Sequence, residues 1–420
     1  MAYTKVVIIG GGFGGLNAAK SLRRAKIDLL ILDKTNHHLF QPLLYQVATA
    51  ALSPGEIAYP IREIFRKQKN TTVIMGEAKA IDKEKKQVTL ANGDIIHYDY
   101  LILSVGARHS YFGNDGWEAF APGLKTINDA LKIREKILIS YEKAERLDSI
   151  TEAAKYLNFC VIGGGPTGVE MAGAIAEIAH TTLFDNFRRI NTSKTKIYLI
   201  EAAPHILPVY SPALSEKAKK ELEKLGVKVL TGKKVINITE GGVQMEDEFI
   251  ESKNVIWAAG NQASPLLKSL NAALDRQGRV LVDPDLSIAG HPEIFVIGDA
   301  ACAMGKEGKP LPAIAPTAIQ QGKYVAKIIK EGLPKDQRPP FVYFDKGSMA
   351  TIGRGKAIAV MGKFQFEGFF AWLAWGLIHI MYLIGFRNRI GVILEWITIF
   401  LTGQRGVRLI HGTLDQDTNK

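Results

Sequence analysis

Apolar runs rich in β-branched residues recur along the chain, and two of them lead into the same glycine-rich turn. The first, VVIIGGGFGG, carries Gly10, Gly12 and Gly15, and the second, FCVIGGGPTG, carries Gly163, Gly165 and Gly168. A helix-like stretch follows each turn, so each pattern predicts a strand, a tight turn and a helix in that order. The chain therefore contains two copies of one strand-turn-helix pattern.

Both copies also end in the same way. DYLILSVGA predicts a strand that closes at Gly106, and NVIWAAG predicts a strand that closes at Gly260. The interval from Gly10 to Gly106 nearly equals the interval from Gly163 to Gly260. Chance similarity between glycine-rich loops would not reproduce the same order of strand, glycines, helix and closing turn over nearly the same number of residues. We therefore predict two α/β units of similar size.

The glycine spacing is typical of dinucleotide binding. The first glycine makes the turn, the second lets the backbone approach a pyrophosphate, and the third lets the helix pack closely on the strand. The helix N-terminus then presents unpaired N–H groups and partial positive charge to the phosphates. Asp33, in IDLLILDK, and Glu201, in KIYLIEAA, each end the next predicted strand and would accept hydrogen bonds from a ribose. Two such sites indicate a chain that moves electrons between two dinucleotides. The segment HTTLFDNFRRINTSK, which precedes the Glu201 strand, is interpreted as an insertion.

A later segment, HPEIFVIGDAACA, predicts a buried strand and a small-residue turn with Gly298 and Asp299. A helix should begin near Pro316, in IAPTAIQQGKYVAKII. In a two-dinucleotide reductase we expect this segment to return to the first unit, with Asp299 at the ribityl or phosphate-side hydroxyls of a flavin. The helix N-terminus would then stabilise negative charge on the reduced flavin ring. Taken alone, Asp299 would be an ordinary turn aspartate.

Near the C-terminus, residues 368–386 form a run of 19 residues whose only strongly polar side chain is His379. A basic turn follows, and residues 390–403 then place apolar side chains on one helical face and Glu395 with two threonines on the opposite face. An anchor on a membrane surface explains this pattern best, because it also uses the aromatic residues and the basic turn. A single membrane span and a core or dimer-interface helix are the alternatives.

The composition narrows the function classes. The 420 residues suggest two or three domains, and 47% hydrophobic residues supply large cores. The two cysteines, Cys160 and Cys302, exclude a disulfide framework and fit a reducing compartment. The first predicted strand lies at the start of the chain, so we expect no secretory signal. A net charge of +11 without a nucleic-acid motif favours an anionic membrane surface over nucleic acid, and we expect no bound metal.

Several segments together resemble the type II NADH dehydrogenases, the single-subunit, non-proton-pumping NADH:quinone oxidoreductases of respiratory membranes. These segments are VVIIGGGFGGLNAA, NHHLFQPLLYQVAT, VIGGGPTGVEMAG, VIGDAA and WLAWGLIHIMYLIGFRNR, and they span nearly the whole chain. The resemblance implies FAD and NADH as cofactors, a membrane quinone as partner, a lipid bilayer surface as attachment site and a homodimer. It also implies a peripheral (monotopic) location on the cytoplasmic face of the membrane.

The resemblance further implies site residues. Glu201 would bind the NADH ribose, and because Ala202 and Ala203 follow it in place of an arginine, NADH should bind better than NADPH. Glu170 would position the nicotinamide and relay protons, although the helix dipole alone also favours an acid in a first turn. The cofactor-binding residues implied are Gly10, Gly12, Phe13, Gly14, Gly15, Asp33, Lys34, Gln46, Val47, Ala80, Ser104, Gly106, Gly163, Gly165, Gly168, Glu201, Gly260, Gly298, Asp299, Ala315 and Ala318.

One departure concerns the quinone side. Family members commonly carry AQxAxQ there, whereas in this chain Pro316 replaces the first glutamine and Gln320 remains. A hydrogen bond from the first side chain is therefore not expected. Lys356, in GRGKAIA, resembles another quinone-side position, and a plain surface lysine is an equal alternative.

These observations predict an α/β fold with two Rossmann-like dinucleotide-binding domains of the two-dinucleotide flavoprotein type and a C-terminal membrane-anchoring helical region. The FAD-binding domain would comprise residues 1–115 and 290–340, the NADH-binding domain residues 116–289, and the anchoring region residues 341–420. The predicted activity is FAD-dependent oxidation of NADH by a quinone, without proton pumping. Alternatives are a sulfide:quinone oxidoreductase, a soluble NADH oxidase or ferredoxin reductase, and an NADH-responsive membrane scaffold.

Overall fold

The computed structural model describes residues 3–410 and divides the chain into two compact units. The first unit comprises Met1–Leu39, Ala58–Arg108 and Asn261–Lys346. The second comprises Phe40–Ile57, His109–Gly260 and Gly347–Lys420. Each unit consists of three separate segments of the chain, so the chain passes from one unit to the other several times.

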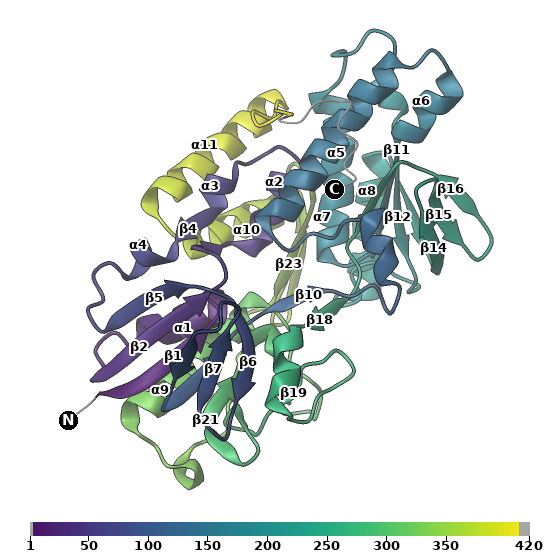
Figure 1. Ribbon diagram of the computed structural model, residues 1–420. Coiled ribbons are helices and arrows are strands. Elements are labelled where there is room, and N and C mark those ends of the chain that lie inside the picture. Colours follow the sequence, from purple (N-terminus) through teal and green to yellow (C-terminus); the bar gives the residue numbers. More distant parts are fainter. Residues whose placement is uncertain (1–2, 411–420) are drawn as a thin grey trace. The chain divides into compact units, whose positions relative to one another are not determined.

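A six-stranded sheet forms the centre of the first unit (Figure 1). Its strands lie in the order β20 (Ser287–Ile288), β21 (His291–Val296), β9 (Tyr100–Leu103), β1 (Thr4–Ile9), β2 (Ile27–Asp33) and β5 (Thr71–Met75). All neighbours pair in parallel except β20 and β21. The central strands are continuous apolar runs, as expected for a parallel sheet covered on both faces. The segment near residue 290 thus lies in the same sheet as the N-terminal strand.

Helices α1 (Phe13–Ser21) and α9 (Ala315–Glu331) pack against each other within this unit. They approach closely because Gly322 has no side chain: an added Cβ would lie 2.3 Å from the backbone oxygen of Gly14. A small antiparallel sheet of β6 (Ala78–Asp82), β7 (Gln87–Leu90) and β8 (Ile95–His97) shares an apolar core with the large sheet. Other elements of this unit are β3 (His37–Leu39), β4 (Ala58–Pro60), α4 (Ile61–Phe65), β18 (Asn261–Ala263), β19 (Val280–Leu281) and β22 (Ala301–Cys302), and β10 (Ala107–His109) pairs with β18.

The second unit repeats this arrangement in a four-stranded parallel sheet. Its order is β13 (Val227–Thr231), β12 (Lys196–Glu201), β11 (Asn158–Ile162) and β17 (Asn254–Trp257). Strand β11 lies between β12 and β17 as β1 lies between β2 and β9. The predicted repeat and the predicted fold class are therefore confirmed. Its helices are α5 (Ile127–Arg146), α6 (Ile150–Tyr156), α7 (Pro166–Glu177) and α8 (Pro212–Lys224), and β14 (Val235–Thr239), β15 (Gly242–Met245) and β16 (Phe249–Glu251) form a separate small sheet.

The C-terminal part of the second unit combines a three-stranded antiparallel sheet with two helices. The strands are β23 (Ser348–Gly353), β24 (Lys356–Met361) and β25 (Phe364–Gly368), and the helices are α10 (Phe369–Tyr382) and α11 (Phe386–Thr402). Two short helices, α2 (Leu44–Ala48) and α3 (Pro54–Ile57), belong to the same unit. Within residues 3–410, no helix combines the length and apolar character that crossing a bilayer would require.

The predicted amphipathic character of α11 is present, and its apolar stripe is exposed. Leu394 and Ile397 are 58% and 50% exposed, whereas Val392 is fully buried and Asn388 donates to the backbone oxygen of Gly55 at 3.0 Å. Helix α10 likewise exposes Phe370, Leu377 and Met381. The two helices therefore pack on the protein through one face and leave an apolar face uncovered in the described chain.

Candidate functional site

The first glycine turn lies between β1 and α1 and depends on the absence of side chains. Gly10 adopts φ +102°, a conformation that L side chains rarely adopt. A Cβ on Gly15 would lie 1.9 Å from the backbone oxygen of Gly10, so the helix could not pack as it does. Ser104, at the end of the neighbouring strand, accepts a hydrogen bond from the Gly15 N–H at 2.9 Å. Next to Gly12, by contrast, the space is open to 4 Å.

The second turn, between β11 and α7, has the same geometry. Gly163 adopts φ +108°, and a Cβ on Gly168 would lie 1.8 Å from its backbone oxygen. The space beside Gly165 is open, as it is beside Gly12. The closing glycines are equivalent too, because Gly106 and Gly260 have φ values of +66° and +71°.

An acidic side chain stands beside each turn. Asp33 ends β2 and accepts a hydrogen bond from the Gly11 N–H at 2.6 Å, and Glu201 ends β12 and accepts one from the Gly164 N–H at 2.5 Å. Asp33 also accepts from the N–H and hydroxyl of Thr35, and Glu201 from the Ala203 N–H. A carboxylate offers about four acceptor positions, so each retains at least one for a ribose hydroxyl. Open space at the middle glycine, a helix N-terminus and an acceptor at the next strand are what a dinucleotide requires. Each cradle therefore fits the adenosine diphosphate portion that FAD and NADH share.

The turn after β21 is held by a residue that the sequence analysis did not single out. Gln321 is buried, and its side-chain oxygen accepts a hydrogen bond from the Gly298 N–H at 2.7 Å. A Cβ on Gly298 would lie 3.3 Å from that of Ala318, so the turn and the start of α9 are in close contact. Asp299 lies in this turn, and α9 begins at Ala315, at the position predicted.

Several predicted residues have defined places within the first unit. Phe13 lies edge-on to His38, whose Nδ1 is 2.9 Å from the Gly11 oxygen. Lys34 is exposed, and Ala80 pairs with Thr89 in the small sheet. His38 was not among the residues predicted for the first glycine turn, although it lies in the NHHLFQPLLYQVAT segment.

Gln320 makes two hydrogen bonds to one backbone residue. Its Nε2 donates to the Phe344 oxygen at 2.9 Å, and its Oε1 accepts from the Phe344 N–H at 2.9 Å. The Gln320 amide therefore holds the chain at Phe344 against helix α9. Whether Gln320 also meets a quinone stays a prediction.

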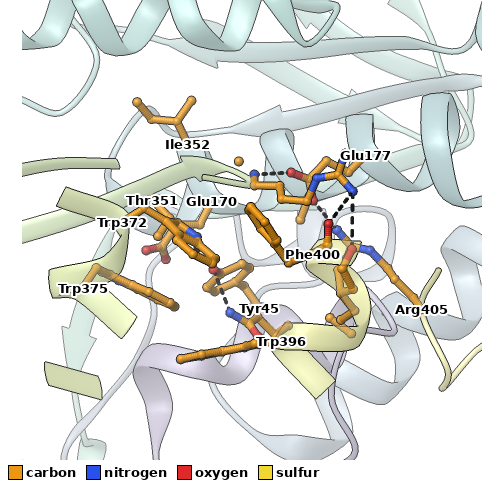
Figure 2. Close-up of a pocket in the computed structure, with 16 residues that line it drawn as sticks. Tyr45, Glu170, Glu177, Thr351, Ile352, Trp372, Trp375, Trp396, Phe400 and Arg405 are labelled. Atoms are coloured by element: carbon orange, nitrogen blue, oxygen red, sulfur yellow. Dashed lines mark hydrogen bonds and ion pairs between the residues drawn. The ribbon is translucent and has the colours of Figure 1, made fainter. Parts of the chain in front are cut away.

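A cavity of about 70 Å³ lies wholly within the second unit (Figure 2). A water molecule needs roughly 10–15 Å³ of such space, so several could fit. Three tryptophans, Trp372, Trp375 and Trp396, form part of the wall. The other lining residues are Tyr45, Gln46, Ala51, Glu170, Ala174, Glu177, Thr351, Ile352, Gly353, Arg354, Ile399, Phe400 and Arg405.

Of the three predicted catalytic residues, Glu170, Gln320 and Lys356, only Glu170 lines this cavity. Burial raises the pKa of its carboxyl group from 4.5 to about 8, and hydrogen bonds from the backbone and hydroxyl of Thr351 oppose this rise. Lys356 is not among the lining residues of the cavity, and its ammonium group pairs with Glu221 of α8. An acid with a raised pKa, in a cavity that five aromatic side chains help to line, is a candidate for proton handling.

Gln46 and Val47 lie in α2, and the structure places them differently from each other. Val47 is fully buried. The Gln46 side chain lines the cavity, donates to the Tyr45 hydroxyl at 3.0 Å and accepts from the Trp396 indole N–H at 2.7 Å. The predicted contact of these two residues with flavin stays a prediction.

Arg405 and Glu177 form an ion pair that no sequence motif signalled. The Arg405 Nη2 lies 2.7 Å from Glu177 Oε2, and its Nη1 donates to the Thr49 oxygen at 2.7 Å. The guanidinium group is 4% exposed, and burial lowers its pKa. This pair connects α7 and the loop after α2 to the chain beyond α11.

Comparisons with known proteins agree with this geometry. A model of the pyridine nucleotide-disulphide oxidoreductase family matches residues 4–322, and a model of the NDH2 C-terminal domain matches residues 346–405. The two glycine cradles and the first match define the class: a pyridine nucleotide-disulphide oxidoreductase.

The relatives narrow this class further. The chain is 47% identical to the type II NADH:quinone oxidoreductase Ndh of Mycobacterium tuberculosis over 417 residues, which cover 96% of this chain and 89% of the relative. It is 29% identical to the type II NADH:quinone oxidoreductase of Staphylococcus haemolyticus, over 85% of this chain and 89% of that protein. The chain therefore belongs to the type II NADH:quinone oxidoreductase family, and the resemblance inferred from its motifs is confirmed.

Solved structures show the same fold. NDH2 from Plasmodium falciparum in complex with NADH aligns with a TM-score of 0.87 at 23% identity, covering 96% of this chain and 99% of that chain. The sulfide:quinone oxidoreductase from Aquifex aeolicus aligns with a TM-score of 0.74 at 18% identity, covering 95% and 96%. At these identities the likeness concerns the fold alone.

Proposed function

We propose that this chain oxidises NADH through bound FAD and passes the electrons to a membrane quinone without pumping protons. The observation that carries the proposal is the 47% identity, over 96% of the chain, to a relative named type II NADH:quinone oxidoreductase. The two glycine cradles support it, because NADH and FAD both contain an adenosine diphosphate that such a cradle binds. Bound flavin supplies a two-electron carrier between nicotinamide and quinone.

We assign FAD to the first cradle and NADH to the second. Gly10, Gly12 and Gly15 would accommodate the FAD pyrophosphate, with Asp33 at its ribose. Gly163, Gly165 and Gly168 would accommodate that of NADH, with Glu201 at its ribose. Because Glu201 is followed by two alanines, no arginine adjoins it to bind a 2′-phosphate, which supports NADH over NADPH.

We propose further roles on the quinone side. Glu170 would hold or deliver a proton near the nicotinamide and flavin, and its raised pKa of about 8 supports this role. Gln320 and Lys356 would lie toward the quinone. The bonds that Gln320 makes to Phe344 and the pairing of Lys356 with Glu221 favour a role in holding those segments.

The domain division proposed is residues 1–115 and 290–340 for FAD, 116–289 for NADH and 341–420 for membrane anchoring. Exposed apolar side chains on α10 and α11, among them Phe370 (77%) and Leu401 (75%), support attachment to a lipid surface. NADH is a cytoplasmic metabolite, which favours the cytoplasmic face of the membrane. A homodimer completes the proposal and follows from the resemblance alone.

An anaerobic titration of the purified protein in detergent tests this function. NADH should bleach the flavin absorbance, NADPH should do so only at much higher concentration, and a water-soluble quinone should then restore the oxidised spectrum. A flavin that NADH bleaches but quinone does not restore would exclude the enzyme and favour a scaffold. A protein that stays colourless after incubation with FAD would refute the cofactor assignment.

A sulfide:quinone oxidoreductase is an alternative with a similar fold, and its redox chemistry needs a cysteine pair. Cys160 is fully buried within β11, where burial raises its pKa to about 12, and Cys302 is buried in β22 of the other unit. A thiol with such a raised pKa is a poor nucleophile at neutral pH. Sulfide should therefore fail to reduce the flavin in the same titration.

A further inference from the structure

A chain of hydrogen bonds runs from helix α11 to Thr351, which lines the same cavity as Glu170 in the second unit (Figure 2). The Trp396 indole N–H donates to the Gln46 side-chain oxygen at 2.7 Å, and the Gln46 amide donates to the Tyr45 hydroxyl at 3.0 Å. The Tyr45 hydroxyl is 3.0 Å from the Thr351 hydroxyl, and hydrogen bonds from Thr351 lower the pKa of the Glu170 carboxyl group. The chain thus joins four segments far apart in the sequence.

The first donor fixes the orientation of the Gln46 amide. An indole N–H can only donate, so Trp396 orients the Gln46 amide with its oxygen toward α11 and its nitrogen toward Tyr45. The Tyr45 oxygen accepts from Gln46. Either hydroxyl can donate in the bond between Tyr45 and Thr351, and a phenol that already accepts one bond favours donating its own proton to Thr351. The Thr351 hydroxyl then donates to Glu170. Hydrogen bonds aligned in this way strengthen one another in an environment of low polarity, which Trp372, Trp375 and Phe400 provide here.

We propose that Trp396 and Gln46 are positioning residues that act through Tyr45 and Thr351 to stabilise Glu170 as a carboxylate. This inference rests on the proposed function, because it concerns the proton that Glu170 would handle during turnover. A carboxylate accepts the Thr351 hydrogen bond more strongly than a neutral carboxyl group does, because hydrogen bonds to an ionised acceptor are the stronger ones. A Thr351 hydroxyl that accepts from Tyr45 is oriented to donate, and so favours the carboxylate form of Glu170. Burial of Glu170 favours the protonated carboxyl, whereas the chain opposes protonation.

The other ionisable groups near Glu170 do not form part of this chain. Tyr210, which precedes α8, interacts electrostatically with Glu170. Glu177, Arg354 and Arg405 line the same cavity, and the carboxylate of Glu177 is paired with the guanidinium group of Arg405. Among the described residues that line the cavity, Thr351 is the one whose hydrogen bonds lower the pKa of Glu170.

The position of Trp396 gives the chain an outer end on a helix with an exposed apolar face. Its ring lies against Trp375, with ring centroids 5.2 Å apart, so a phenylalanine would keep the aromatic packing and lose only the N–H. Removing that donor frees the Gln46 amide to rotate. The Tyr45 and Thr351 hydroxyls can then reverse, which makes the protonated form of Glu170 more favourable.

The pH dependence of quinone reduction tests this proposal. Using saturating NADH and a water-soluble quinone, Thr351→Val should raise the apparent pKa assigned to Glu170 by about one pH unit, since one hydrogen bond to a carboxylate is lost. Trp396→Phe should raise it by a smaller amount, and Thr351→Ser should restore the native value. Glu170→Gln should abolish the titration and so identify the group.

Matched variants separate this effect from general damage. Thr398→Val is the control for Thr351→Val: it removes a threonine hydroxyl on α11 that, among the contacts described, bonds only the Leu394 oxygen. Trp117→Phe is the control for Trp396→Phe: it removes an indole N–H that donates to Asn237. Both should leave the apparent pKa unchanged. If Thr351→Val does not fold, Trp396→Phe decides, and an infrared titration of the Glu170 carboxyl band gives a second reading.

An unchanged pKa in Trp396→Phe and in Thr351→Val, with the titration still lost in Glu170→Gln, overturns the proposal and leaves the proposed function intact. A flavin that NADH does not reduce refutes the proposed function itself. An equal shift in Trp117→Phe would show that the change is not specific to the chain and also overturns the proposal.

Discussion

Replacing Arg405 with methionine removes the cation from a buried ion pair. The guanidinium group is 4% exposed and the Glu177 side chain 19%, with 2.7 Å between Nη2 and Oε2. Methionine has a similar length but no donor, so Glu177 keeps its charge without the paired cation, and the Thr49 oxygen loses a bond of 2.7 Å. Breaking a buried pair from one side costs about 3–5 kcal/mol. Because Glu177 is partly exposed and also accepts from the Arg354 N–H, we expect the lower end, about 3 kcal/mol.

Urea unfolding followed by tryptophan fluorescence measures this loss, since three of the five tryptophans line the adjoining cavity. Arg405→Lys, which retains the charge but cannot bridge two acceptors in the same way, should lose about half as much. The double variant Arg405→Met with Glu177→Met should be more stable than Arg405→Met alone, because no unpaired charge remains. A loss below about 1 kcal/mol for Arg405→Met, or strictly additive losses in the double variant, would refute the reasoning.

Four further predictions concern the two glycine turns, Glu170 and Lys356. Gly15→Ala should abolish flavin binding through its clash with the Gly10 oxygen, whereas Gly12→Ala should fold normally and bind FAD more weakly, as absorbance after dialysis would show. Glu201→Gln should reduce the preference for NADH over NADPH about tenfold in kcat/KM, because the negative charge beside a 2′-phosphate is lost. The pKa of Glu170 is raised from 4.5 to about 8 in the folded protein. Its contribution to the free energy of unfolding is therefore complete below pH 4.5 and is lost as the pH rises through 8. Glu170→Gln should remove this pH dependence in urea unfolding experiments. Lys356→Met should change stability by less than about 1 kcal/mol, as expected for a partly exposed pair, and a large rise in the quinone KM would instead support its predicted catalytic role.

The sequence predicted those parts of the structure that depend on local geometry. Gly10 and Gly163 must adopt positive φ, and Gly15 and Gly168 must admit a backbone oxygen, so the residues that make the turns are also the residues that identify them. The strands on either side are short apolar runs with acids at their ends. Such features repeat wherever the same turn is needed, which is why the two units could be recognised and matched to each other.

The cavity could not be predicted in the same way. Tyr45, Glu170, Thr351 and Trp396 come from four separate segments, and their contacts depend on how α2, α7, β23 and α11 pack. Gln46 was expected at the flavin because of its segment, and only the structure shows its bonds to Tyr45 and Trp396. A hydrogen-bond chain leaves no periodic pattern in a sequence, whereas an apolar helical face does.

Helix α11 illustrates why the two kinds of information must be combined. Its apolar period predicted an amphipathic helix, and the exposed Leu394 and Ile397 carry that period. Its other face holds Trp396 and Asn388, whose N–H groups donate to the Gln46 side-chain oxygen and to the Gly55 oxygen. The same helix therefore presents an apolar surface outward and fixed hydrogen-bond donors inward. A displacement of α11 away from α2 would lengthen the bond from Trp396 to Gln46. Contacts on the outer face of α11 and the orientation of the Gln46 amide are therefore physically linked.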